Sequence, residues 1–162
     1  KSTDKMVVLA GNPDNLDPAD PCGISFASVT GGIEVQEISE MGPVCAAAGK
    51  EAPTQVTLPD APSEQQALIT GRVQAILYDP AGAEYVSKQN GDKLEVLPGL
   101  VPGVNQTPAG WAFPKGGSPV QTAVLAAIDE LIADGTWGQI LSDAGLSDLA
   151  IVPPTVDGLP QQ

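Results

Sequence analysis

The sequence predicts an α/β fold in which a mainly parallel sheet is flanked by helices, and three observations lead to this prediction. Short apolar segments alternate with segments of helical character between residues 6 and 97. The connections between these segments are short and carry glycine or proline. An alternation of strand and helix with short connections is typical of βαβ units, whose strands lie parallel.

Five segments of this region are expected to form strands. Residues 73–78, VQAILY, are a short apolar run that is typical of a buried strand. Residues 6–10, MVVLA, are a second run of this kind, and the other three segments are short and bounded by turn residues. The expected strands are residues 6–10, 24–29, 55–58, 73–78 and 94–97.

Three helices are expected between and after these strands. The second of them is predicted to begin at a capping box formed by Ser63 and Gln66. The third opens with Pro80, whose fixed φ suits the first helical position. The expected helices are residues 33–48, 63–70 and 80–89.

The composition changes after residue 97, and the rest of the chain is expected to be mainly helical. Residues 98–108 are expected to form a loop and residues 110–114 a crossing strand. Ser118 is predicted to cap a long helix, and Thr136 a shorter helix that ends at Gly145. A loose tail should follow. The apolar face of the long helix consists of Val120, Val124, Ala127, Ile128, Leu131 and Ile132.

The composition excludes several classes of function. The net charge of −13 argues against binding to nucleic acid or to anionic membrane surfaces. The sequence contains no histidine, which removes serine–histidine and cysteine–histidine triads and the commonest metal ligand. No apolar run approaches the length needed to span a membrane. We therefore expect a binding module rather than an enzyme, without a metal or a cofactor.

The two cysteines, Cys22 and Cys45, leave two alternatives, a disulfide or two free thiols. Two cysteines without histidine do not make a usual zinc site. Both cysteines flank glycine-rich turns rather than lying inside apolar runs, so we expect a disulfide. Such a bond would place the protein outside the cytosol.

Asp79 is the most informative candidate for a ligand contact. It follows the expected strand 73–78 directly and precedes the helix that Pro80 opens. Open α/β sheets bind small ligands at the carboxyl ends of their strands. An N-cap role for Asp79 explains the same position equally well, and both roles can hold together.

Between Asp20 and about Ile151 the chain resembles the extracytoplasmic solute-binding proteins of amino-acid ABC importers, which have the type II periplasmic-binding-protein fold. The segments that carry the resemblance lie in the same order and at similar spacing. They are Cys22-Gly23, Gly31, Cys45 with Ala48-Gly49-Lys50, GRVQAILYD (71–79), AFPKG (112–116) and AIDELIADGTWGQIL (127–141).

The resemblance implies two lobes that close on a solute at a hinge. Residues 1–10 would form a hinge strand, residues 11–100 the second ligand-binding lobe, and residues 101–150 a return strand with C-terminal helices of the first lobe. Residues 151–162 would be a tail. The N-terminal segment that builds most of the first lobe in the family is absent from this sequence, and with it the arginine that grips a ligand carboxylate. Paired cysteines at such positions support the disulfide.

The resemblance also implies the site residues. Asp79 matches the carboxylate that binds a ligand ammonium group, and the turn Thr30-Gly31-Gly32-Ile33 matches the one that cradles a ligand carboxylate. The family usually has hydroxyl residues where Gly32 and Ile33 stand. A small solute other than an amino acid is therefore also an alternative. The alternative is a tight turn that simply requires glycine.

Other candidates have simpler explanations. Tyr78 and Trp111 could line the cleft, but aromatic residues on strands, Phe113 among them, are more often part of the core. Two groups of acidic residues are interpreted as solvated surfaces rather than as a calcium site or a binding face. These groups are Asp14, Asp17 and Asp20 in a loop, and Glu34, Glu37 and Glu40 on one helix face.

These observations lead to one main functional hypothesis and two alternatives. The main hypothesis is a solute-binding component of an ABC importer, which delivers a small polar solute such as an amino acid to a membrane permease. Such a protein would be extracytoplasmic: in the periplasm, secreted or held at the cell surface as a lipoprotein. The alternatives are a sensor or interaction module that has lost solute binding, and a dehydratase or lyase of related fold. The apolar face of the long C-terminal helix predicts a homodimer.

Overall fold

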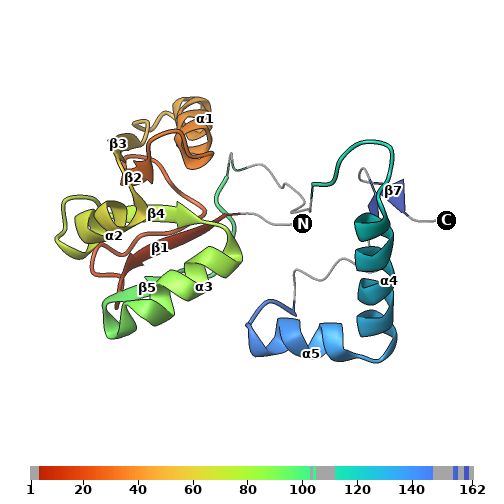
Figure 1. Cartoon of the computed structure of the whole chain (residues 1–162). Coiled ribbons are helices and arrows are strands. Elements are labelled where there is room, and N and C mark those ends of the chain that lie inside the picture. The colour runs from red at the N-terminus through yellow and green to blue at the C-terminus, as the bar shows by residue number, and fades with distance from the viewer. Residues whose placement is uncertain (1–3, 103, 105–111, 148–154, 157–158, 161–162) are drawn as a thin grey trace. The chain divides into compact units, whose positions relative to one another are not determined.

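The structure is a computed structural model that describes residues 4–102, 104, 112–147, 155–156 and 159–160. The chain divides into two compact units (Figure 1). The first unit comprises residues 3–106, and the second comprises residues 107–162 together with residues 1 and 2.

The first unit is a five-stranded sheet with helices on both faces. The strands follow the order β3-β2-β4-β1-β5 across the sheet. β2 is parallel to β3 and β4, whereas β1 is antiparallel to β4 and β5, so four strands point one way and β1 runs against them. The mainly parallel sheet flanked by helices is therefore confirmed. Its elements are β1 (Lys5–Leu9), β2 (Ser25–Val29), α1 (Glu34–Ala47), β3 (Thr54–Leu58), α2 (Ala61–Ile69), β4 (Ala75–Tyr78), α3 (Pro80–Gln89), η1 (Gly91–Lys93) and β5 (Leu94–Val96).

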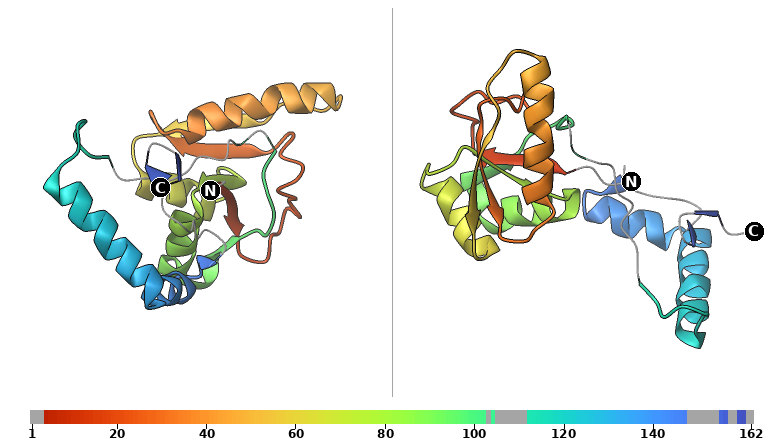
Figure 2. Two further views of the ribbon diagram at one scale, coloured as in Figure 1. Left: turned by 90° about the vertical axis from the view of Figure 1, so that its right-hand side faces the viewer. Right: turned by 90° about the horizontal axis from the view of Figure 1, so that it is seen from above.

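Two apolar clusters hold this unit together, one on each face of the sheet. Side chains of β1 alternate between them: Met6 and Val8 pack in the α1 cluster, and Val7 in the α2–α3 cluster. Figure 2 shows α1 on one side of the sheet and α2 and α3 on the other. The buried members of the α1 cluster are Met6, Val8, Ile24, Phe26, Ile38, Met41, Ala75, Leu77, Leu97 and Val101. Those of the α2–α3 cluster are Val7, Ala27, Ala67, Leu68, Val73, Ile76, Ala83, Val86 and Leu94.

The connections of the sheet diverge between β2 and β4. From β2 the chain passes through α1 to β3 at the edge, and α2 then returns it to β4 on the other side of β2. A crevice at the carboxyl ends of two such neighbouring parallel strands is the usual ligand position in open α/β sheets. The residues that follow β2 and β4 are therefore the first candidates for a ligand site.

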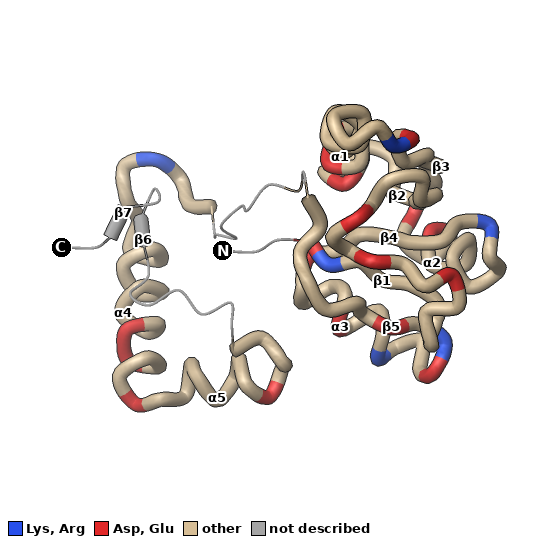
Figure 3. The backbone as a smooth tube through the Cα atoms, turned by 180° about the vertical axis from the view of Figure 1, so that it is seen from behind, with Lys and Arg blue, Asp and Glu red and all other residues tan. Residues whose placement is uncertain are grey.

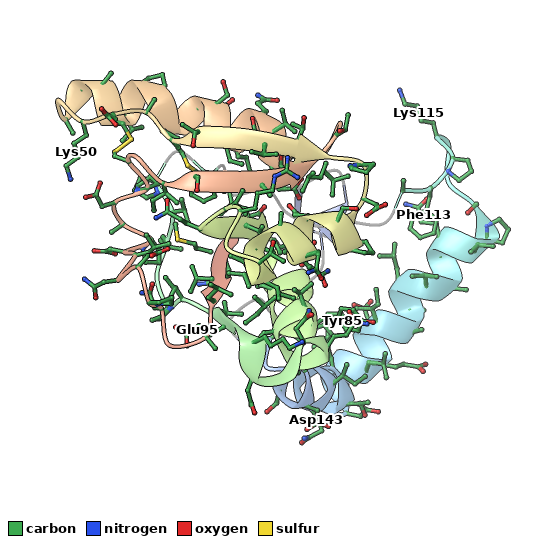
Figure 4. The ribbon with its side chains drawn as sticks, turned by 90° about the vertical axis from the view of Figure 1, so that its left-hand side faces the viewer. Lys50, Tyr85, Glu95, Phe113, Lys115 and Asp143 are labelled. Atoms are coloured by element: carbon green, nitrogen blue, oxygen red, sulfur yellow. A yellow bond between two sulfur atoms is a disulfide. The ribbon has the colours of Figure 1, made fainter. Side chains whose placement is uncertain are left out.

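A disulfide joins Cys22, before β2, to Cys45 in the last turn of α1, with the two Cα atoms 5.5 Å apart. Figure 4 shows it as a yellow bond near Lys50. Lys50 itself pairs with Asp20 through Nζ and Oδ2. The expected disulfide is therefore present, and free thiols are excluded.

Some of the expected helix caps are wrong. α2 begins at Ala61 rather than Ser63, because Asp60 is its N-cap and accepts a hydrogen bond from Ser63 N at 2.8 Å. α5 is preceded by Gly135 in the left-handed conformation, so Thr136 is its first helical residue and not its cap. In both cases the sequence offers two residues that can cap the helix, and the backbone conformation selects the earlier one.

The second unit contains α4 (Pro119–Ala133), α5 (Thr136–Asp143) and a short antiparallel pair, β6 (Thr155–Val156) and β7 (Leu159–Pro160). Ser118 caps α4 as predicted and accepts a hydrogen bond from Gln121 N at 3.1 Å. The pair β6–β7 lies within the tail that was expected to be loose. The expected crossing strand 110–114 is not a strand at its described residues 112–114. No helix in the described part of the chain is long and apolar enough to cross a membrane.

Candidate functional site

Asp79 lies where the sequence predicts it, at the end of β4 and before α3. Its Oδ1 atom accepts hydrogen bonds from Ala81 N at 3.0 Å and from Gly82 N at 3.1 Å. Asp79 is therefore the N-cap of α3, and its side chain is exposed at the carboxyl edge of the sheet. The cap uses one carboxylate oxygen, and no hydrogen bond to the other is present among the described residues.

The turn after β2 contains the second group of predicted ligand residues. Gly31 has φ of +80°, which other residues rarely adopt, so this position requires glycine. Thr30 uses its hydroxyl group to donate a hydrogen bond to Leu58 O at 3.1 Å, and Gly32 N donates to Val29 O at 2.9 Å. Ile33 is the N-cap of α1 without a side-chain cap, and its side chain is 57% exposed.

Glu34 covers this turn with its own carboxylate. A Cβ atom on Gly32 would clash with Glu34 Oε2, so the carboxylate lies directly over the glycine. The resemblance to amino-acid-binding proteins implies that the corresponding turn receives a ligand carboxylate. Here a negative charge of the protein lies against the first turn of α1.

Asp4, directly before β1, lies at the same edge of the sheet. The antiparallel register pairs Lys5 with Tyr78, which places Asp4 opposite Asp79. The carboxyl group of Asp4 also forms a hydrogen bond with that of Glu37 on α1. Two carboxyl groups form such a bond only when one of them holds a proton. The residues Asp4, Glu34, Glu37 and Asp79, here termed the acidic cluster, thus come from three different segments of the chain.

Glu37 is the most buried member of the acidic cluster, with 4% of its surface exposed. Burial, together with the neighbouring charges of Asp4, Glu34 and Glu40, raises the pKa of Glu37 to about 8. Burial also raises the pKa of Asp4. The expectation that Glu37 belongs to a solvated face is therefore wrong. It lies four residues before Met41 and eight before Cys45, which are buried on the same side of α1, and this spacing was the signal in the sequence.

Tyr78 and Glu64 form a second buried polar pair beside the cluster. Tyr78 Oη donates a hydrogen bond of 2.6 Å to Glu64 Oε2, and Glu64 is 2% exposed. Burial raises the pKa of Glu64 to about 7 and raises that of the Tyr78 hydroxyl as well. The hydroxyl of Tyr78 is therefore already engaged within the protein. Sequence reasoning missed Glu64, because a single acid in a helix gives no sign of its burial.

The remaining predicted residues do not join this edge. Trp111 lies outside the described residues. Asp17 accepts a hydrogen bond from Ala19 N at 2.9 Å within its own loop, and Asp20 pairs with Lys50. Within the described ranges, no three acidic or cysteine side chains are arranged to hold a metal ion. Figure 3 shows acidic segments on α1.

A separate depression of about 460 Å³ lies on the surface between β3 and α2. Arg72, the only arginine of the sequence, lines it. None of the predicted ligand residues does. Its other lining residues are Leu58, Pro59, Pro62, Ser63, Gln66, Ala67 and Thr70.

Comparison with known proteins gives one curated relative and several structures of similar fold. No protein-family model matches the chain. The arginine-binding protein ArgT of Corynebacterium glutamicum is 28% identical over 134 residues, which are 82% of this chain and 43% of that protein. The chain therefore spans less than half the length of this relative.

Three solved structures, of two proteins, show how far the fold is shared. An ancestral arginine-binding protein, solved with arginine and with glutamine, is 23% identical with a TM-score of 0.58 in the first and 24% identical with a TM-score of 0.61 in the second. These alignments cover 88% and 90% of this chain and 60% of each structure. AncCDT-1, an ancestral amino acid-binding protein and a precursor of cyclohexadienyl dehydratase, is 19% identical with a TM-score of 0.63, over 88% of this chain and 57% of that one. The expected type II periplasmic-binding-protein fold and the resemblance to solute-binding proteins are confirmed.

Proposed function

We propose that this chain belongs to the solute-binding component of an ABC importer and binds a small polar solute of the amino-acid class for delivery to a membrane permease. One observation carries the proposal. The exposed carboxylate of Asp79 follows β4, and the turn of residues 30–33 follows the neighbouring parallel strand β2. Both therefore lie at the carboxyl edge of the sheet, between the two strands where its connections diverge, which is the usual ligand position in open α/β sheets.

The binding role of Asp79 rests on charge and geometry. Its Oδ1 atom is held by two backbone N–H groups of α3, so the carboxylate has a fixed position before any ligand arrives. A fixed carboxylate at the edge of a sheet can accept hydrogen bonds from an ammonium group without further ordering cost. Tyr78 and Trp111 are proposed to border the bound solute.

The proposed mechanism involves binding without chemistry. A solute that binds better to a closed arrangement of two lobes shifts the population toward that arrangement, which a permease can then recognise. The Cys22–Cys45 disulfide supports a location outside the cytosol, since such bonds persist in oxidising compartments. The named relatives support the amino-acid class, because they are arginine-binding and amino acid-binding proteins.

A second candidate is a sensor or interaction module of the same fold that no longer binds a solute. Gly32 and Ile33 favour it, because they supply no hydroxyl group at the turn where the family usually has one. A dehydratase or lyase is less well supported. Within the described residues the raised pKa values at the edge belong to acids that are buried or bonded to each other.

Calorimetric titration of this chain with the twenty amino acids and their amine derivatives tests the proposal. We expect at least one of these solutes to bind, and Asp79→Asn to weaken its binding about tenfold or more, because the fixed charge is lost. Asp92→Asn removes the same charge at an exposed position on η1 and should leave binding unchanged. No binding of any solute would favour the sensor module.

A further inference from the structure

The acidic cluster contains four carboxyl groups, and none of them has a basic partner among the residues that the structure describes. The salt bridges among the described residues join Lys50 to Asp20 and Lys88 to Glu84, and neither involves the cluster. Asp4 has its pKa raised by burial and by the charges of Glu34 and Asp79, although its hydrogen bond with Glu37 acts in the opposite direction. The cluster therefore concentrates negative charge that the described part of the protein does not neutralise.

Glu37 supplies an independent sign of a missing partner. Its Oε2 atom is buried, and no nitrogen or hydroxyl group of the described residues donates a hydrogen bond to it. A buried acceptor without a donor is destabilising, so such atoms need an explanation. The burial of this atom beside Asp4 and Glu34 points to a donor that the described residues do not supply.

Glu34 decides which ligand group this end of the site can receive. Its carboxylate lies over Gly32, against the turn before α1. A ligand carboxylate brought to the same turn would meet the charge of Glu34, and like charges in contact repel each other. A cation would instead be attracted by the carboxylate of Glu34 and by the neighbouring charges of Asp4 and Asp79.

We propose that the acidic cluster is a binding site for an ammonium or guanidinium group, and that the solute of this protein is an organic amine or guanidine without a free carboxylate at this end. The inference rests on the proposed function and narrows its substrate class. A metal ion is a poorer fit, since the described acids offer no group of three in metal-binding geometry. An ammonium or guanidinium group carries several N–H donors and can reach separated carboxylates at hydrogen-bond distance.

The protonated state of Glu37 gives binding a distinctive signature. The charged groups that face Glu37 are Asp4, Glu34 and Glu40, and with burial they keep it protonated near neutral pH. An arriving cation favours the ionised carboxylate, so the Glu37 proton should leave to solvent as the cation binds. Binding at pH 7 should therefore release a proton, in addition to any heat of contact.

The test compares agmatine with arginine, because agmatine is arginine without its α-carboxylate. Calorimetric titration should give at least about tenfold tighter binding of agmatine. Equal or tighter binding of arginine, or of a neutral amino acid, would overturn the inference and leave the proposed function standing. If no solute of the wider panel binds, both are overturned.

Matched variants connect this preference to the cluster. Glu34→Gln should reduce the preference for agmatine over arginine at least about fivefold, because the repelling charge is gone. Glu37→Gln should weaken agmatine binding and abolish the proton release, measured by titration in buffers of different ionisation enthalpy. Glu51→Gln removes one charge at an exposed position away from the cluster and should change neither quantity. A preference that Glu34→Gln leaves unchanged would contradict the inference.

Discussion

Individual buried acids make the stability of this protein depend on pH in an unusual direction. The pKa values of Glu37 and Glu64 are raised to about 8 and about 7, above the ordinary value of 4.5. Between pH 4.5 and these values the folded chain holds protons that the unfolded chain has released, so the free energy of unfolding falls as pH rises. The acids whose pKa values are lowered act only at more acidic pH, and these are Asp20, Asp60 and Asp134.

We predict a higher melting temperature at pH 5 than at pH 8. Each buried acid should contribute on the order of 1–3 kcal/mol to the difference, because its ionisation in the folded state is disfavoured. Glu37→Gln and Glu64→Gln should raise the melting temperature at pH 8 and flatten its pH dependence, as measured by calorimetry. Glu51→Gln is the control with the same change of charge and should leave the slope as it is. A slope that neither buried variant alters would show that overall charge repulsion causes it.

The hydrogen bond between Tyr78 and Glu64 gives a second prediction at this scale. Tyr78→Phe removes the donor and leaves a buried carboxyl group unpaired, so the free energy of unfolding should fall by about 1–3 kcal/mol. Tyr85→Phe is the matched control, because Tyr85 is 63% exposed on α3 (Figure 4). Chemical denaturation of both variants measures the difference. An equal loss in both would contradict the assigned role of Tyr78.

At the scale of elements, the sequence predicts helices well where two local signals agree. α3 spans Pro80–Gln89 as expected, because Asp79 caps it and proline suits its first position. Similarly, Ser118 followed by proline predicts the start of α4. The prediction fails at α2, where both Asp60 and Ser63 can cap a helix and only the path of the preceding loop selects Asp60.

The candidate site could be predicted only in part, for a related reason. Asp79 and the turn of residues 30–33 are marked by their positions after strands, which local sequence reveals. Asp4 reaches the site through the register between β1 and β4, which joins segments more than seventy residues apart. That pairing is not contained in the local sequence. Burial of Glu37 depends on which side of α1 faces the sheet, and its spacing from Met41 and Cys45 is the one local signal for it.

The disulfide connects two elements and gives the element-scale prediction. It ties the start of β2 to the end of α1 across a loop of about 24 residues, so its loss should cost about 3 kcal/mol through the unfolded state. Replacing both cysteines by serine should lower the midpoint of chemical denaturation accordingly. Because Cys45 is fully buried, replacing both cysteines by alanine controls for burial of a hydroxyl group. Unchanged midpoints in both variants would contradict a stabilising role.

At the scale of the whole molecule, the two units differ in how much core they contain. Both apolar clusters of the sheet, and the disulfide, lie within residues 3–106. In the second unit, by contrast, α4 and α5 contain no buried residue. Val120 is 65% exposed and Ile140 is 50% exposed. The stability of the molecule is therefore concentrated in the first unit.

This asymmetry predicts self-association of the full chain through the apolar face of α4. A helix that exposes an apolar face of this kind tends to bury it against another molecule. Light scattering after gel filtration should therefore show a dimer whose fraction grows with protein concentration. Val120→Glu and Val124→Glu place charges on that face and should shift the chain to monomer. The first unit alone, residues 3–106, serves as the control: it should unfold cooperatively, because it keeps both clusters, and remain monomeric. A full chain that stays monomeric at high concentration, or a first unit that dimerises equally well, would show that α4 does not drive association.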